Sequence, residues 1–86
     1  MKVNVTRQDI DQGERANCCN CPVARAIARL VPEGDQVEVL YASILRRGLQ
    51  CRIVRIPEEV RDFIKKFDRG RWVKPFSFDL PDSFFA

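Results

Sequence analysis

Hydrophobic and polar residues alternate near the start of the chain, and the segment that follows has no regular spacing of hydrophobic residues. Val3 and Val5 alternate with polar neighbours in KVNVT, which predicts a short strand. Residues 7–17, RQDIDQGERAN, follow no period and end in turn-forming residues, so we expect a loop that extends to Cys21. A loop of this length is unusual in a small domain, and it is either functional or partly helical.

Two later segments have the 3.6-residue period of amphipathic helices. The first begins at Pro22, which suits a first helical turn, and ends at PEGD. The second, PEEVRDFIKKFDRG, begins at Pro57, carries acids first and lysines late, and ends at Gly70. The apolar positions of the first helix are Val23, Ala26, Ile27, Leu30 and Val31, and those of the second are Val60, Phe63, Ile64 and Phe67. We expect Phe63, Ile64 and Phe67 to face Ile27 and Leu30.

The remaining patterned segments predict strands. QVEVLYASILRR, residues 36–47, is apolar on both faces and predicts one long strand in the middle of a sheet. RRGLQ then reverses the chain into CRIVRI, which predicts a hairpin. In WVKPFSFDL the alternation of Phe76, Phe78 and Leu80 predicts a last strand, and Pro75 favours an edge position for it.

The predicted order of elements is therefore β-α-β-β-α-β in a single α+β domain over residues 1–86. This order favours a four-stranded mixed or antiparallel sheet with both helices on one face, as in ferredoxin-like folds. Such an architecture carries enzymes, RNA binders and regulators alike, so function has to be argued from a site.

Composition narrows the class of protein. The chain has 86 residues, of which 45% are hydrophobic and 31% charged, as in one small soluble domain. It contains no apolar run of roughly 18 residues that would span a membrane, and its first residues do not resemble a signal peptide. We therefore expect a cytoplasmic protein without membrane contact, whose four cysteines are reduced.

Several motifs resemble those of a known group of proteins. VNVTRQDIDQG, CPVARAI, PEEVRDFIKKFDRG and VKPFSFDLP, in this order, resemble small hypothetical proteins encoded by tailed bacteriophages, in particular phages of actinobacteria. The resemblance covers nearly the whole chain. It implies an accessory protein that acts in the host cytoplasm, and it transfers no catalytic or binding residue.

Three of the four cysteines lie together in NCCNC, directly before the first helix. Cys18 and Cys21 form a C-x-x-C where a helix N-terminus favours the thiolate, which binds zinc or exchanges disulfides. A zinc site would need Cys18, Cys21 and Cys51, because the chain has no histidine, and a second C-x-x-C is missing. A thioredoxin-like redox site is a further alternative, although Pro57 begins a helix where that family has a strand. We favour the interpretation without metal, in which Cys21 packs near the helix cap and Cys18 and Cys19 are loop thiols.

Catalytic patterns are missing elsewhere too. Without histidine there is no Ser-His-Asp or Cys-His arrangement, and neither G-x-x-x-x-G-K nor G-x-G-x-x-G occurs. The carboxylates of Asp9, Asp11, Glu14, Asp79 and Asp82 show no spacing that singles out a pair. We therefore expect a protein that is not an enzyme and that needs no cofactor.

The favoured function is a protein-binding module, which in an infected cell would modulate a host or defence factor. Its sequence support is the aromatic end of the chain, where DSFFA leaves two phenylalanines on a tail. The expected docking residues, for a protein partner or for a second copy in a homodimer, are Trp72, Phe76, Phe84 and Phe85. The alternative is that this tail folds back onto the sheet.

Nucleic-acid binding is the second candidate function, because the basic residues concentrate in one half of the chain. Residues 1–43 carry five basic and six acidic side chains, whereas residues 44–86 carry ten basic and six acidic ones. RNA readers of this fold usually carry stacking aromatics on the central strands, and CRIVRI has none, so binding would rest on phosphate contacts and weaken with salt. The candidate residues are Arg46, Arg47, Arg52, Arg55, Lys65, Lys66, Arg69 and Arg71.

Overall fold

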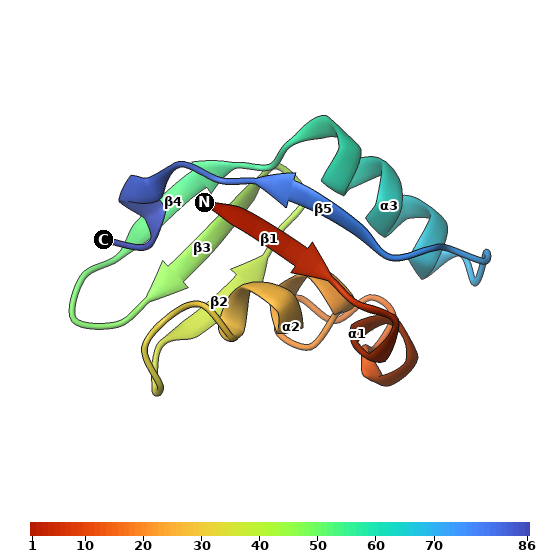
Figure 1. Ribbon diagram of the computed structural model, residues 1–86, viewed down its shortest axis with the longest axis horizontal. Coiled ribbons are helices and arrows are strands. Elements are labelled where there is room, and N and C mark those ends of the chain that lie inside the picture. The colour runs from red at the N-terminus through yellow and green to blue at the C-terminus, as the bar shows by residue number, and fades with distance from the viewer.

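A computed structural model describes all residues, 1–86, and shows two separate antiparallel sheets (Figure 1). The first pairs β1 (Lys2–Val5) with β5 (Phe76–Asp79), and the second has the order β2 (Gln36–Val39), β3 (Ser43–Arg47), β4 (Arg52–Arg55). The predicted α+β class is confirmed, but the single four-stranded ferredoxin-like sheet is wrong. No helix of this structure has both the length and the apolar composition needed to cross a membrane.

The predicted long strand over residues 36–47 is in fact two strands joined by a turn. Val37 and Val39 are buried in β2, whereas Ile44 and Arg46 are buried in β3. The buried positions thus change from odd to even numbers, which one straight strand cannot do because its side chains alternate strictly between faces. Residues 36–47 looked apolar on both faces because they contain two strands, one with odd and one with even buried positions. β3 does lie in the middle of its sheet, and β3 and β4 form the predicted hairpin.

A short helix, α1 (Arg7–Gln12), lies in the segment expected to be a loop. Thr6 caps it, because its hydroxyl accepts the N–H of Asp9 while the Asp9 carboxylate accepts the N–H of Thr6. This reciprocal capping box is visible in the sequence as T-x-x-D. It marks the start of a helix that the spacing of hydrophobic residues does not indicate.

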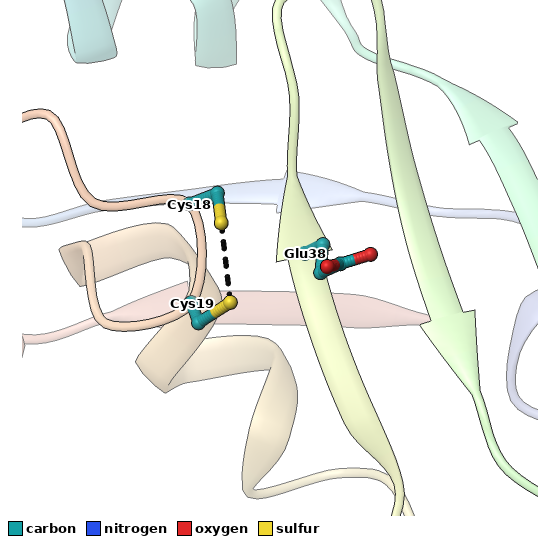
Figure 2. A group of neighbouring side chains, drawn as sticks. All are labelled: Cys18, Cys19 and Glu38. Carbon is teal, nitrogen blue, oxygen red and sulfur yellow. Dashed lines mark hydrogen bonds between the residues drawn. The ribbon is translucent and has the colours of Figure 1, made fainter.

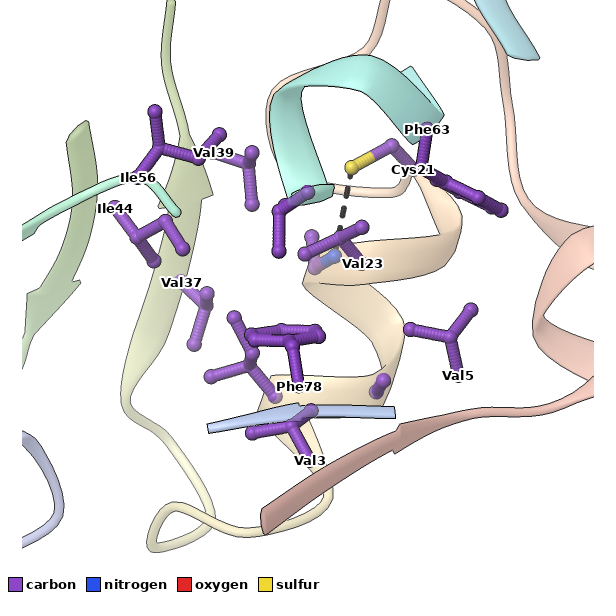
Figure 3. Packing of buried hydrophobic residues seen from close by; sticks show 14 of the residues in the cluster. Val3, Val5, Cys21, Val23, Val37, Val39, Ile44, Ile56, Phe63 and Phe78 are labelled. Carbon is purple, nitrogen blue, oxygen red and sulfur yellow. Dashed lines mark hydrogen bonds between the residues drawn. The ribbon is translucent and has the colours of Figure 1, made fainter. Parts of the chain in front are cut away.

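The second helix, α2 (Pro22–Ala28), lies between the two sheets and contacts both β1 and β2 (Figure 3). Its buried residues surround most of its circumference, since the side chains of Ala24 and Ala26 are buried together with Val23 and Ile27. These small side chains let two sheets approach one helix closely. A helix covered on both sides cannot lie on the open face of a single sheet, which explains the failure of the predicted layering. The helix ends before Leu30, which is exposed and does not join the predicted stripe.

The third helix, α3 (Glu58–Asp68), follows the prediction closely. Val60, Phe63 and Phe67 are buried, and Ile64 is partly buried against the same core. Gly70 ends the helix with a positive φ of 76°, and the N–H groups of Gly70 and Arg71 are donated back to the carbonyls of Phe67 and Lys66. This left-handed stop is the reason for a glycine at that position.

The chain ends in a 3₁₀ turn, η1 (Asp82–Phe84), that folds back onto the core. Phe84 is 2% exposed, and Phe85 packs edge-on against it with ring centroids 5.2 Å apart. Arg46, itself 8% exposed, donates hydrogen bonds to the carbonyls of Phe84 (2.9 Å) and Ala86 (3.3 Å). Residues 82–86 are therefore part of the folded domain, as the alternative interpretation of the tail required.

Replacing Phe84 by alanine should lower the free energy of unfolding by about 3 to 5 kcal/mol, because a buried phenylalanine leaves a cavity. Chemical denaturation followed by circular dichroism measures this change. Trp72→Ala is the matched control, since that ring is 75% exposed and its removal should change stability by about 0.5 kcal/mol or less. Equal effects of the two substitutions would show that the tail does not pack as described.

Candidate functional site

The polar side of α3 carries the strongest concentration of unpaired charge. Four cations line one shallow depression there, with Asp62 as the single acid: Lys65, Lys66, Arg69 and Arg71. All four are exposed, and none forms an ion pair with a carboxylate. We call these four residues the basic α3 face.

The sequence explains why these cations share one surface. Lys65 and Arg69 are four residues apart and Lys66 and Arg69 three apart, so they lie on adjacent positions of one helical face. Cations near a helix C-terminus interact favourably with the helix dipole, whereas like charges at this spacing repel each other. The guanidinium of Arg15 lies against Gly70, between Arg69 and Arg71 in the chain, and so adds a further cation to this surface. Sequence reasoning missed Arg15. The repulsion on the basic α3 face leaves it well suited to an anionic ligand.

The other predicted nucleic-acid residues divide into two groups. Arg55 is exposed and lines a neighbouring depression together with Arg61 and Lys65, so it extends the basic α3 face. Arg46 does not belong to this surface, because it is buried and its Nε donates to Asp35 at 2.8 Å.

Arg47 and Arg52 are occupied locally. Arg47 donates to Glu38 at 3.0 Å, and Arg52 donates to Gln50 and to the carbonyl of Cys51. Of the eight predicted cations, Arg55 and the basic α3 face line two depressions that share Lys65, whereas Arg46, Arg47 and Arg52 line neither of them.

Among the predicted docking aromatics, only Trp72 is exposed to solvent. Phe76 is partly buried against Phe63, with ring centroids 4.7 Å apart, and Phe84 is part of the core. Trp72 is 75% exposed and lies 5.6 Å from the guanidinium of Arg7. It lines a depression that contains two lysines, Lys66 and Lys74, and two acids, Glu59 and Asp62. Because Lys66 lines both depressions, the indole adjoins the basic α3 face.

The predicted cysteine ligands do not converge. Cys21 is buried at the start of α2, where its sulfur accepts the N–H of Ala24 at 3.4 Å, and burial raises the pKa of its thiol. Cys51 is exposed in the connection between β3 and β4. The packing role expected for Cys21 agrees with this placement. Cys18 and Cys21 line one cavity together, but no third predicted ligand joins them, since Cys51 does not line that cavity.

A different group does converge, namely Cys18, Cys19 and Glu38 (Figure 2). The two sulfur atoms lie 3.1 Å apart, and one carboxylate oxygen completes a set of three ligand atoms within 4.8 Å of one another. The hydrogen bond with Cys18 raises the pKa of the Cys19 thiol. Sequence reasoning missed Glu38 because it lies on β2, and only the folded chain brings it beside the loop.

Asp9 is the one fully buried carboxylate, and its contacts are structural. It accepts hydrogen bonds from Arg29 through both oxygens and from the N–H of Thr6, and Arg25 lies 3.8 Å away. Burial by itself would raise the pKa of Asp9, but the hydrogen bonds from Arg29 and Thr6 outweigh it, and the net pKa is lowered. A carboxylate held ionised in this way joins α1 to α2 and is a poor proton donor near neutral pH.

Comparison with known proteins returns no match to any family model, curated protein or solved structure. The resemblance to bacteriophage proteins stays a prediction from the motifs. Function therefore has to be argued from the surfaces described above.

The lowered pKa of Asp9 predicts a specific loss of stability in acid. The ionised carboxylate stabilises the fold above its unfolded pKa of about 4, and this contribution is lost as the pH falls through the lower folded pKa. Asp9→Asn should lower the free energy of unfolding at neutral pH by about 1 to 3 kcal/mol, and the difference from wild type should shrink in acid.

The measurement is denaturant unfolding at a series of pH values. Asp11→Asn is the matched control in the same helix, because Asp11 is exposed and only distantly paired with Arg7 at 3.9 Å. A difference between Asp9→Asn and wild type that did not change with pH would contradict the stabilising role of the ionised form.

Proposed function

We propose that this protein is a non-enzymatic binding module whose ligand is a single-stranded nucleic acid, bound along the basic α3 face. The observation that carries this proposal is the cluster of four exposed cations around one depression, none of them neutralised by a carboxylate. A phosphate backbone neutralises such a row of cations and releases its own counterions.

Trp72 favours a single strand over a duplex. Its exposed indole adjoins the basic α3 face and offers an aromatic surface on which an unpaired base can stack. Arg7, at 5.6 Å from the ring, holds the indole by a cation–π contact. Cations that follow a backbone next to a stacking aromatic are the usual arrangement of proteins that bind single strands with little sequence preference.

The predicted protein-docking function of the aromatic tail has less support, because most of its aromatic residues are not exposed. Phe84 is buried and Phe85 partly buried, so Trp72 is the one member of that set free to meet a partner. An acidic protein segment is the competing ligand for the same cations. The accessory role in phage infection suggested by the motifs is compatible with either ligand.

The proposal predicts binding of labelled single-stranded oligonucleotides that weakens steeply with salt. If the four cations of the basic α3 face each contact one phosphate, the slope of log K against log salt should be about −3, since each contact contributes roughly −0.7 for a single strand. Trp72→Ala should weaken binding by about 1 to 3 kcal/mol with little change in that slope, because a stacking contact carries no charge. Fluorescence anisotropy at low and physiological salt measures both quantities.

Lys66→Gln combined with Arg69→Gln should weaken binding and make the salt slope shallower. A matched pair, Lys2→Gln combined with Arg47→Gln, removes the same charge outside the basic α3 face and should leave the slope unchanged. Equal losses in both double variants would mean that net charge alone attracts the oligonucleotide. Absence of binding at low salt, together with binding of an acidic peptide, would replace nucleic acid by a protein ligand.

A further inference from the structure

We infer that Cys18, Cys19 and Glu38 form a binding site for a soft divalent cation such as zinc or cadmium (Figure 2). The site lies where the loop before α2 meets β2, and its three ligand atoms lie within 4.8 Å of one another. A donor set of two sulfurs and one carboxylate oxygen binds thiophilic metal ions in preference to magnesium or calcium. This site is separate from the basic α3 face and does not depend on it.

The spacing of the two sulfurs suits one metal ion. Two thiolate ligands of a tetrahedral zinc ion lie about 3.8 Å apart, because each Zn–S bond is about 2.3 Å long. The sulfurs of Cys18 and Cys19 are 3.1 Å apart, so a small rotation of the exposed side chains opens the required space. The adjacency of the two cysteines in the chain is therefore no obstacle in this loop conformation.

Hydrogen bonds from backbone N–H groups hold this loop in place. The N–H of Val39 donates to the carbonyl of Cys18 at 2.8 Å, which fixes the loop against β2 next to Glu38. The side-chain oxygen of Asn17 accepts the N–H groups of Cys19 (2.9 Å) and Asn20 (3.0 Å). A site whose ligands are already positioned loses less conformational entropy on binding than one assembled from a mobile loop.

Arg47 supports the third ligand from outside the site. Its Nε donates to one oxygen of Glu38 at 3.0 Å, so that the other oxygen remains available for a cation. Hydrogen-bonded carboxylate ligands of this kind are common in metal sites, where the outer partner fixes the orientation of the ligand. The hydrogen bond between Arg47 and Glu38 therefore positions a ligand of the site formed with Cys18 and Cys19.

The proton balance of binding is simple. Each thiol becomes a thiolate when it bonds to the cation, so the two cysteines together release two protons to solvent per ion. No oxidant or reductant takes part. Three protein ligands leave one tetrahedral position for water or another donor, so we expect an exchangeable ion rather than a permanently held structural one.

The test is a titration of the reduced full-length protein with cadmium alone, followed by the ultraviolet absorbance of thiolate-to-metal charge transfer. We expect one ion per chain and a monomer in light scattering at saturation. Cys18→Ser and Cys19→Ser should each reduce the band strongly, and Glu38→Gln should keep the band but weaken binding at least tenfold. Arg47→Gln should weaken binding by about tenfold, the lower end of the effect of an outer partner.

Cys51→Ser is the matched control, because Cys51 is also exposed but lies in another loop, and it should bind cadmium like the wild type. Circular dichroism of each variant verifies that the fold is unchanged. Failure of the wild type to develop the band would overturn the site, as would an equal loss in Cys51→Ser. One ion for two chains with dimer formation would show that cysteines of different chains share the metal, which also contradicts a single-chain site.

Discussion

The buried guanidinium of Arg46 joins the two parts of this fold. It extends from the central strand β3, forms an ion pair with Asp35 at 2.8 Å, and donates to the carbonyls of Phe84 and Ala86. A charged group at 8% exposure is costly to bury unless its donors are satisfied, and here partners come from two distant segments. Gly48 is part of this arrangement, since a side chain at that position would collide with the Asp35 carboxylate that Arg46 holds.

The two sheets share no backbone hydrogen bonds, so side-chain packing and a few polar contacts hold them together. α2 fills the space between them, Asp9 joins α1 to α2 through Arg29, and the segment held by Arg46 follows directly after β5. The strand pair β1 and β5 is thus joined to the three-stranded sheet through a helix, a buried carboxylate and the last residues of the chain. This dependence explains why aromatic residues near the end of the sequence belong to the core.

The surfaces available for function are those that this packing leaves free. The apolar side of α3 is used against the core, which leaves its cations exposed, with Trp72 just beyond the helix. The loop before α2 is fixed by Asn17 and by β2, and it presents two thiols at the surface. Neither candidate site uses a residue of the buried core.

Local chemistry in the sequence determined most of the individual elements. Pro22 and Pro57 begin α2 and α3, Gly70 ends α3, and alternation predicts β1, β4 and β5, because caps, stops and period are properties of neighbouring residues. The same reasoning predicted the cations of α3, since residues three and four apart on a helix share a face wherever the helix packs. It also placed Cys21 at the start of a helix.

Only the tertiary structure decided how these elements combine. Residues 36–47 form a hairpin because Val39 and Ile44 are buried on the same side of the sheet. Both sheets pack against α2 because its small alanine side chains allow close approach. Arg46 left the predicted binding surface, and Glu38 joined Cys18 and Cys19, through contacts between residues eleven to forty positions apart. Such contacts depend on which surfaces the chain buries together, and a local pattern of residue types contains no information about that choice.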